Sequence, residues 1–325
     1  MTVDKALEKE YGKSSFFTAD SLLETEDVVI PISPALDLIL SGGIPEGSFV
    51  LVTGPPKIGK TTMCLQFAAN AQKEEFGGRD VHFFNVEGRL KKLNILGIRG
   101  LQANKIQVIG SSQEKILYAE DYLDILIKYV ESKPNSVFIL DSLSQLCSKE
   151  RQANGIGNRF RDNVPLMLAD FTKKISNILP INKSIFLGIT HLIANQGQGH
   201  KVWLEASGQK VQYQADVKLK ATHQNPHLDG DKQVGQIIHW LCETSALGPP
   251  MMKADSLLRY GQGLDMEYEL LNMCIDIGIV QKGGSWLTMP DETKIQGIEK
   301  ACAKLRENPN LYNELNKQFK TSLGL

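Results

Sequence analysis

Short apolar runs alternate with longer amphipathic stretches along most of this chain. Continuous apolar runs are typical of strands buried on both faces, and they predict strands over residues 48–53, 81–86, 136–140 and 184–190. The amphipathic stretches between these runs predict helices over residues 61–73, 114–132 and 164–179. Because strands and helices alternate, we expect an α/β fold with a mostly parallel central sheet covered by helices.

Shorter elements are expected on either side of this alternation. They are a polar helical segment at 1–24, strands at 28–31, 105–109, 217–221 and 236–240, and helices at 35–40 and 294–306. We therefore divide the chain into an N-terminal helix and strand (1–34), a core (35–270) and a small α+β C-terminal unit (271–325).

The composition is that of an ordinary globular protein. Of the 325 residues, 42% are hydrophobic and 22% charged, and the net charge is −1, which excludes a disordered chain and a uniformly basic nucleic-acid coat. Any site for a polyanion must therefore be local. No apolar stretch reaches about 18 residues, and the charged N-terminus lacks the apolar core of a signal peptide. We expect a cytoplasmic protein whose five widely spaced cysteines are reduced thiols rather than zinc ligands.

The segment 54–61 is the strongest motif in the sequence. It reads Gly-Pro-Pro-Lys-Ile-Gly-Lys-Thr and fits a phosphate-binding loop at every fixed position, with a predicted strand before it and a predicted helix after it. Backbone N–H groups and the helix dipole would face phosphate oxygens, Lys60 would bridge the β- and γ-phosphates, and Thr61 would ligate Mg²⁺. We expect ATP and Mg²⁺ at Gly54, Pro55, Pro56, Lys57, Ile58, Gly59, Lys60, Thr61 and Thr62.

Two acidic residues stand where strands end. Asp141 follows the strand 136–140 and precedes Ser142, at the position where a carboxylate supports Mg²⁺ beside a phosphate loop, and we expect both residues in the nucleotide site. Glu87 follows the strand 81–86, and at the carboxyl edge of a parallel sheet its carboxylate would orient and deprotonate the attacking water. A helix-capping Asp and a solvated loop Glu are the simpler interpretations of the same residues.

Further motifs occur in order around the loop. They are Ile32–Gly47, Phe138–Leu143, Ile189–His191, Arg259–Asp265, Ile277–Val280 and Gly284–Trp286. Together with the loop, this set resembles the RecA-type strand-exchange recombinases, and most closely the phage UvsX recombinases. The resemblance covers about residues 25–320 and implies a RecA-like ATPase core.

The resemblance also implies roles for individual residues. Glu87 would be the hydrolytic glutamate, and Tyr260 matches a tyrosine that lies over the nucleotide. His191 would be the switch that connects ATP to the DNA-binding loops; phage members have His there and bacterial members Gln. A neutral imidazole at a strand end could also hydrogen-bond the γ-phosphate and report its loss, whereas an ordinary strand-end histidine is the alternative.

Two segments, 149–163 and 192–208, match the DNA-binding loops of this family in position. Residues 149–220 contain eleven lysines and arginines against five acidic residues, so this stretch carries +6 and the rest of the chain −7. Basic side chains would neutralise phosphates while a glycine or an aromatic ring approaches the bases, although a solvated charged face is the simpler interpretation. The candidate DNA-binding residues are Arg159, Arg161, Lys201, Trp203 and Gly208.

The sequence departs from the bacterial members at two places. Where they have a lysine pair that reaches the γ-phosphate across the subunit interface, Thr244 and Ala246 stand here, so Lys253 or a metal ion would substitute. Asn94 takes the position nearest their adenine-stacking tyrosine.

The resemblance implies a filament-forming recombinase that acts on single-stranded and double-stranded DNA in phage recombination, repair and replication. Single-strand-binding and mediator proteins would be further partners, and an apolar patch at 16–17 would dock on a neighbouring subunit. A ring helicase would need an N-terminal collar, for which the 53 residues before the loop leave little room. A regulatory ATPase would need a tandem core or a zinc module, and a non-catalytic mediator would lack Lys60, Glu87 or Asp141.

Overall fold

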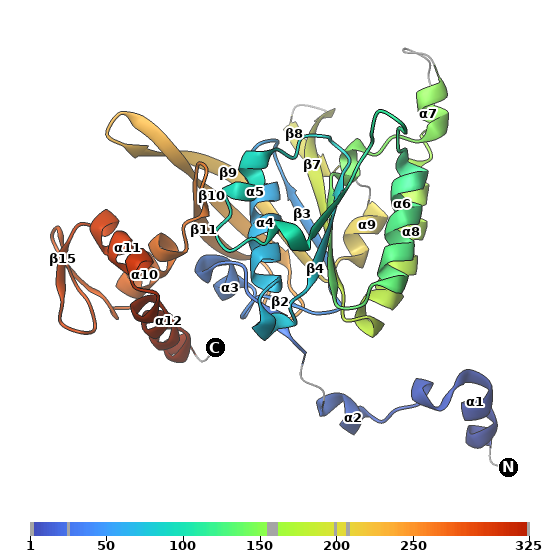
Figure 1. The fold of residues 1–325 in the computed structure, drawn as a ribbon, viewed down its shortest axis with the longest axis horizontal. Coiled ribbons are helices and arrows are strands. Elements are labelled where there is room, and N and C mark those ends of the chain that lie inside the picture. Colours follow the sequence, from blue (N-terminus) through green and yellow to red (C-terminus); the bar gives the residue numbers. More distant parts are fainter. Residues whose placement is uncertain (1–2, 25–26, 155–161, 198–199, 206–208, 324–325) are drawn as a thin grey trace.

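The computed structural model describes residues 3–24, 27–154, 162–197, 200–205 and 209–323. Within these residues the largest sheet has ten strands in the order β12-β11-β10-β9-β3-β7-β6-β4-β5, with β8 paired to β7 (Figure 1). Its strands are β3 (Phe49–Gly54), β4 (Asp80–Asn85), β5 (Ile106–Ile109), β6 (Ser136–Asp141), β7 (Ile185–Gly197), β8 (His200–Glu205), β9 (Val217–Asp229), β10 (Lys232–Thr244), β11 (Met252–Arg259) and β12 (Gly263–Leu264).

Six neighbouring strands, from β9 through β3 to β5, run parallel, and β10, β11 and β12 extend the sheet antiparallel. The mostly parallel α/β sheet expected from the sequence is therefore confirmed. The carboxyl ends of β3, β4, β6 and β7 share one edge, because parallel strands all end on the same side. This edge is where the predicted site residues belong.

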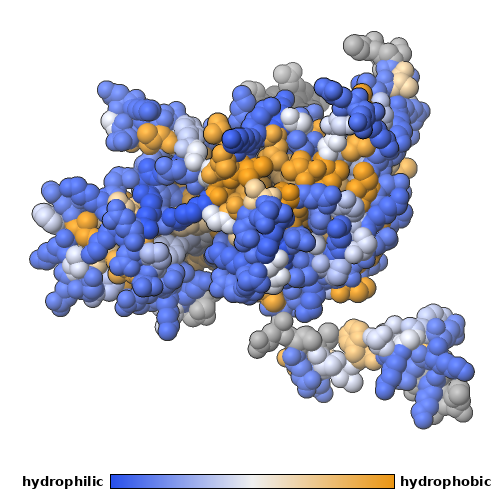
Figure 2. Space-filling model, viewed as in Figure 1, coloured by the Kyte–Doolittle hydropathy of each residue, from blue (hydrophilic) through white to orange (hydrophobic). Residues whose placement is uncertain are grey.

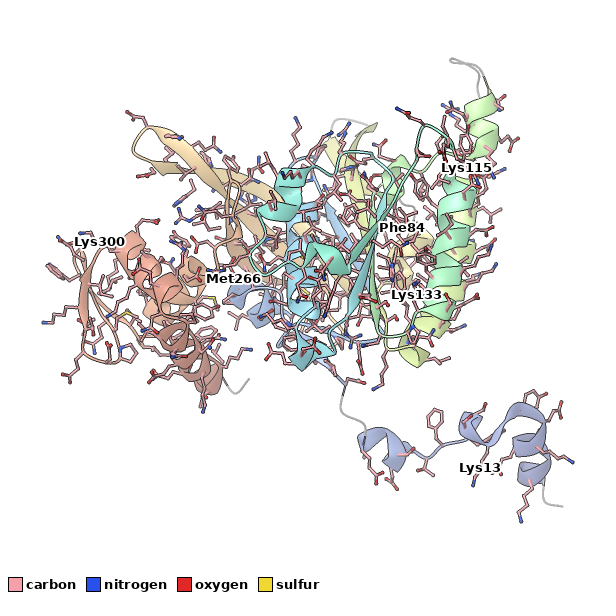
Figure 3. The ribbon with its side chains drawn as sticks, in the orientation of Figure 1. Lys13, Phe84, Lys115, Lys133, Met266 and Lys300 are labelled. Atoms are coloured by element: carbon pink, nitrogen blue, oxygen red, sulfur yellow. The ribbon has the colours of Figure 1, made fainter. Side chains whose placement is uncertain are left out.

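Helices cover both faces of the sheet (Figure 1). Those on one face are α6 (Ala119–Ser132), α8 (Val164–Ile181) and α9 (Gln209–Gln214), and those on the other are α3 (Pro34–Ile39) and α4 (Lys60–Ala71). Adjacent residues of β3 divide between the two cores: Leu51 lies on the α8 side and Val52 on the α4 side. Phe84 of β4, labelled in Figure 3, also belongs to the α8 side. Strand residues point alternately to opposite faces, which is why these strands are apolar throughout.

A small C-terminal unit has a core of its own. It consists of α10 (Met266–Asp276), β13 (Gln281–Gly283), β14 (Trp286–Thr288), β15 (Lys294–Gln296), α11 (Ile298–Glu307) and α12 (Pro309–Leu323). Leu270, Leu305 and Phe319 are among the buried residues that fill it. The boundary expected between residues 270 and 271 lies within α10, whose residue Leu270 belongs to this C-terminal core.

The N-terminal residues form an arm. It comprises α1 (Val3–Tyr11), a 3-10 turn (Lys13–Ser15) and α2 (Ala19–Leu23), and Figure 1 shows both helices projecting away from the sheet. Phe16 and Phe17 are 44% and 66% exposed. The chain then enters the core through β1 (Val29–Ile30), which pairs with β2 (Ile44–Pro45).

Several predicted elements differ from the structure. The helix expected from residue 114 begins at Ala119, because the preceding segment is held as a turn: the Lys115 and Leu117 N–H groups donate to the hydroxyls of Ser112 and Ser111. Serine hydroxyls offer the backbone an alternative to helical hydrogen bonds. The helix expected over 294–306 is instead β15 followed by α11, and Gly297, with φ 87°, separates them.

In two regions the strand pairing extends further than the sequence predicts. The segment 192–208 is expected as a loop, but its residues 192–197 and 200–205 pair as antiparallel strands, with Leu192 opposite Glu205 and Gly197 opposite His200. Apolar and β-branched residues on both arms favour strand pairing there. The strands expected at 217–221 and 236–240 extend into β9 and β10, whose pairing runs from Lys218–Thr244 to Asp229–Lys232. In the other predicted loop, 149–163, residues Lys149–Ala153 form a short helix, α7.

The remaining structural expectations concern cysteines and membrane segments. All five cysteines are free thiols; four are buried and Cys147 is partly buried. Among the described residues, no helix combines the length and apolarity needed to cross a bilayer.

Candidate functional site

The loop after β3 has the backbone of a phosphate cradle. Gly54, Lys57 and Gly59 have φ values of 152°, 61° and 111°, so the chain turns sharply before α4 begins at Lys60. A Cβ at Gly54 would lie 2.8 Å from the carbonyl oxygen of Ala221, which requires glycine there. The loop therefore brings N–H groups and the N-terminus of a 12-residue helix to one point, an arrangement that fits phosphate oxygens.

Lys60 is the buried cation of this loop. Its side chain is 4% exposed, and Nζ donates to the carbonyl oxygens of Gly54 at 2.9 Å and Pro55 at 2.7 Å. Nζ also lies 3.2 Å from Nδ1 of His191. Burial lowers the pKa of Lys60 to about 8, although the charges of Asp141 and Glu87 oppose that shift.

Thr61 and Asp141 meet between α4 and the end of β6. The Thr61 hydroxyl donates to Oδ2 of Asp141 at 2.7 Å. Burial raises the pKa of Asp141 above its ordinary value, and the hydrogen bond from Thr61 opposes the rise. A hydroxyl and a carboxylate beside a phosphate cradle are the oxygen ligands that Mg²⁺ prefers, so these residues fit that ion.

Glu87 is held in place by two hydrogen bonds to one oxygen. Its Oε1 accepts from the Ser142 hydroxyl at 2.9 Å and lies 2.6 Å from Nε2 of His191. Oε2 has a weaker partner, the exposed Arg89, at 3.4 Å. Burial raises the pKa of Glu87, but the hydrogen bonds from His191 and Ser142 outweigh it and hold the pKa below its ordinary value.

His191 connects Lys60 with Glu87. A lysine ammonium only donates, so Nδ1 of His191 must accept from Lys60, and the ring proton then sits on Nε2 and is donated to Glu87. We assign the neutral tautomer on this basis. The strand ends of β3, β4, β6 and β7 thus bring together Lys60, Thr61, Glu87, Asp141, Ser142 and His191.

Two supporting residues escaped the sequence analysis. The Ser144 hydroxyl donates to Ser142 at 3.0 Å, because Ser142 gives its one proton to Glu87, and Oγ of Ser144 accepts from the His191 N–H at 3.3 Å. Gln236 of β10 is 5% exposed, and its Nε2 donates to the Ile58 carbonyl in the phosphate loop. In the sequence, the only sign of such a role for Gln236 is a polar residue within a predicted apolar strand.

A hollow lies beside the phosphate loop at the turn after β11. It has a volume of about 190 Å³ and is lined by Thr62, Asn94 and Tyr260, among others. The Tyr260 hydroxyl accepts from Nε2 of Gln233 at 2.7 Å and is 3.4 Å from Oε1 of Gln236. Tyr260 is thereby joined through Gln236 to the phosphate loop.

Comparison with known proteins agrees with this geometry. Residues 2–265 match the RecA N-terminal domain, and residues 268–324 match the RecA C-terminal domain. The chain belongs to the RecA family. This chain is 27% identical to "Protein RecA" of Streptomyces ambofaciens and 25% identical to "Protein RecA" of Nitratiruptor sp.. The alignments cover 98% and 99% of this chain and 84% and 92% of those relatives.

The structure describes the candidate DNA-binding residues of this RecA-family chain only in part. Arg159, Arg161 and Gly208 lie outside the described residues. Lys201 and Trp203 belong to β8, and the structure describes their backbone only, paired with Gln196 and Ala194 of β7.

The two positions that the resemblance aligns with the lysine pair of bacterial members lie at and just after the end of β10. Thr244 is the last residue of β10, and Ala246 follows in the connection to β11. Lys253 lies in β11 opposite Leu241 and is exposed.

Proposed function

We propose that this RecA-family chain is a DNA-dependent ATPase that forms a helical filament on single-stranded DNA and exchanges strands with a homologous duplex. The observation that carries the proposal is the contact chain from Lys60 through His191 to Glu87. It ties the phosphate loop to β7, the strand that pairs with β8 in the second predicted DNA-binding segment. A site built only to hydrolyse ATP does not need that connection.

Glu87 would act as the base that orients and deprotonates the attacking water. Its lowered pKa keeps the carboxylate ionised at neutral pH. Because His191 and Ser142 both use Oε1, the proton would pass to Oε2. The contact with exposed Arg89 at 3.4 Å is too weak to block that oxygen.

ATP would lie along the phosphate loop, residues 54–61, and Thr62, with its base in the hollow under Tyr260. Lys60 would leave the carbonyl oxygens of the loop to hold the β- and γ-phosphates, and this move would end its contact with His191. Thr61 and Asp141 would hold Mg²⁺, which neutralises charge on the phosphates.

DNA would bind to the segments 149–163 and 192–208. Support comes from the charge of +6 carried by residues 149–220 in a chain of net charge −1. Arg159, Arg161 and Lys201 would contact phosphates, and Trp203 and Gly208 would approach the bases. His191 stands on the strand that leads into the second segment, so loss of the γ-phosphate would be transmitted along β7.

Filament formation would use the N-terminal arm and the nucleotide face. The arm exposes Phe16 and Phe17, which would dock on a neighbouring subunit. Figure 2 shows apolar side chains gathered on the face where α5 (Lys92–Leu96) lies, and Leu93 and Leu96 are 75% and 66% exposed. Apolar patches of this kind mark contacts with other proteins. The exposed Lys253 is the candidate for the missing cation from the neighbour.

Histidine at position 191 favours the phage-type members of the family over the bacterial ones. We therefore propose a UvsX-like recombinase that works in the host cytoplasm in recombination, repair and replication, with single-strand-binding and mediator proteins as partners.

Electron microscopy with single-stranded DNA and a non-hydrolysable ATP analogue tests the proposal. A helical filament that requires both DNA and nucleotide is the expected result. Closed rings would favour a helicase, and particles unaffected by DNA would favour a regulatory ATPase. ATP hydrolysis measured with and without single-stranded DNA should rise on DNA addition, and an unchanged rate would contradict the proposal.

A further inference from the structure

The turn that carries Tyr260 is closed at its base by an ion pair. Strands β11 and β12 form a tight hairpin in which Arg259 pairs with Gly263, and Tyr260 lies in the turn between them. Nε of Arg259 donates to Oδ2 of Asp265, directly after β12. Arg259 and Asp265 therefore clamp the two ends of the turn.

Asp265 is the centre of this clamp. Its side chain is 1% exposed, Oδ1 accepts from the Tyr268 N–H at 3.0 Å and thereby caps α10, and Oδ2 also accepts from Arg306 at 2.6 Å. Burial raises the pKa of Asp265, but Arg259, the Tyr268 N–H and Arg306 outweigh it and keep the carboxyl ionised. Each oxygen of this carboxylate thus has a structural partner.

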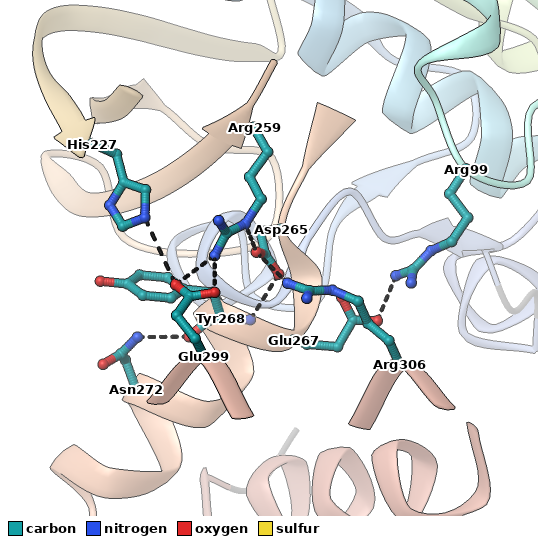
Figure 4. A network of polar contacts seen from close by, with 9 residues as sticks. All are labelled: Arg99, His227, Arg259, Asp265, Glu267, Tyr268, Asn272, Glu299 and Arg306. Atoms are coloured by element: carbon teal, nitrogen blue, oxygen red, sulfur yellow. Dashed lines mark hydrogen bonds and ion pairs between the residues drawn. The ribbon is translucent and has the colours of Figure 1, made fainter. Parts of the chain in front are cut away.

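The C-terminal unit supplies two of the charged partners from α11. Glu299 accepts two hydrogen bonds from Nη2 of Arg259, at 2.7 and 2.8 Å, and Arg306 binds Asp265 (Figure 4). Glu267 completes the group, since it pairs with Arg306 at 3.5 Å and with Arg99 at 2.6 Å. Three arginines and three carboxylates balance, so the cluster holds the C-terminal unit to the core rather than attracting an anion.

The clamped turn separates two hollows. The first is the hollow beside the phosphate loop, lined by Thr62 and Tyr260. The second has a volume of about 400 Å³ and is lined by Asp265 and Arg306. Arg259 and Gly261 line both hollows. A Cβ at Gly97 would lie 3.1 Å from the Gly261 carbonyl group, so the turn also packs closely on the segment after α5. The turn therefore cannot shift without changing the hollow in which Tyr260 stands.

We propose that Glu299 is a positioning residue for nucleotide binding: the C-terminal unit, through Glu299 and Arg259, sets the position of Tyr260 over the base. This inference rests on the proposed binding of ATP and adds to it a dependence on the C-terminal unit. Glu299 itself touches no part of the phosphate site. Its strong partner is the Arg259 guanidinium, through which its effect passes, and its other partner among the described residues, His227, lies 3.8 Å away.

Steady-state kinetics of Glu299→Gln test the proposal. We expect KM for ATP to rise about three-fold, the effect of one partly exposed ion pair, with kcat unchanged. Inhibition by inorganic triphosphate, which has no base, should keep its wild-type constant, because the clamp acts on the base and not on the phosphate loop. The matched control is Glu307→Gln on the same helix, an exposed carboxylate without an ion pair among the described residues, and it should behave as wild type.

Arg259→Lys provides the second arm, because lysine cannot keep the forked contact with Glu299 and Asp265. If Glu299 acts through Arg259, adding Glu299→Gln to Arg259→Lys will raise KM no further. An unchanged KM in Glu299→Gln, equal weakening of ATP and triphosphate, or full additivity in the double variant would overturn the inference. If instead the wild-type protein hydrolyses no ATP, the proposed function itself is wrong.

Discussion

Nε2 of His191 lies 2.6 Å from Oε1 of Glu87, although their strands are not neighbours in the sheet. His191 stands in β7 and Glu87 follows β4, so the contact passes over the end of β6, where Asp141 and Ser142 lie. The proposed base and the proposed switch therefore share one hydrogen bond. A movement of either side chain changes the surroundings of the other.

Replacing Glu87 with Gln should separate ATP binding from hydrolysis. Glutamine keeps the size of the side chain but cannot take up the proton of the attacking water. We expect nucleotide binding to remain and hydrolysis to fall by at least about 100-fold. Equilibrium binding of a fluorescent ATP analogue and single-turnover hydrolysis measure the two quantities. Hydrolysis at the wild-type rate would show that Glu87 is not the base.

His191→Ala should remove the response to DNA. The substitution breaks the contact between the phosphate loop and β7. Lys60 keeps its hydrogen bonds to the loop carbonyls, Glu87 keeps the one from Ser142, and Asp141 keeps the one from Thr61. Basal hydrolysis is expected within about two-fold of wild type, because the base remains ionised, and stimulation by single-stranded DNA should be lost. A variant that DNA still stimulates fully would refute the switch.

The same variant should have a different acid limb in its pH–rate profile. In the wild type the hydrogen bonds from His191 and Ser142 hold the pKa of Glu87 below its ordinary value of 4.5, so hydrolysis persists as the pH falls towards that value. Without His191 one of the two hydrogen bonds that oppose the effect of burial is lost, so the pKa of Glu87 rises. Basal hydrolysis by His191→Ala should therefore decline at higher pH than in the wild type. Coincident profiles would contradict the role of this hydrogen bond.

The nucleotide affinity of the wild type should fall above about pH 8. The pKa of Lys60 is lowered to about 8 by burial, so in the free protein the side chain loses its charge as the pH rises through that value. Phosphate binding favours the charged form, and ATP binding at pH 8.5 should take up a proton, which calorimetry in buffers of different ionisation enthalpy detects. Lys60→Arg should bind without proton uptake from this group, and Lys60→Ala should abolish turnover at every pH.

DNA affinity should decrease steeply with salt. Each phosphate contact lowers log K by about 0.7 per log unit of salt on single strands. Arg161→Ala and Lys201→Ala should each reduce the slope by about that amount without changing sequence preference, because phosphate contacts carry no base information. Lys174→Ala, an exposed lysine on α8 in the same +6 segment, is the control and should keep the slope. Unchanged slopes in both test variants would place the DNA site elsewhere.

The positions of the central site residues could be predicted because each follows an apolar strand. In a parallel sheet the strand ends gather at one edge, so Glu87, Asp141 and His191 had to lie near the phosphate loop. The short side-chain contacts at this edge could not be predicted, since they depend on the stagger of strands up to two places apart in the sheet. Ser144 illustrates this limit: it resembles any serine of a turn until its contact with the His191 N–H is known.

Contacts between residues far apart in the sequence could not be predicted for a related reason. The extension of β9 past Ala221 contains Asn225 and Pro226, residues typical of turns, and only the pairing with β10 makes that segment a strand. Arg259, Asp265 and Glu299 likewise have no shared spacing that marks a cluster. Tertiary packing places their side chains together and outweighs local preference.

The strand β3 emerges from the ribosome long before either of its neighbours in the sheet. It pairs with β7, with Phe49 opposite Phe186, and with β9, with Val50 opposite Val217. A nascent chain that ends before β7 therefore contains the phosphate loop, but both edges of its leading strand are unpaired. Pairing across such large loops is slow, because the entropy of loop closure is lost before the contacts form. The nucleotide site thus forms late in folding. In an incomplete chain the unpaired apolar strand β3 is prone to aggregation, and the ATPase site is not yet formed.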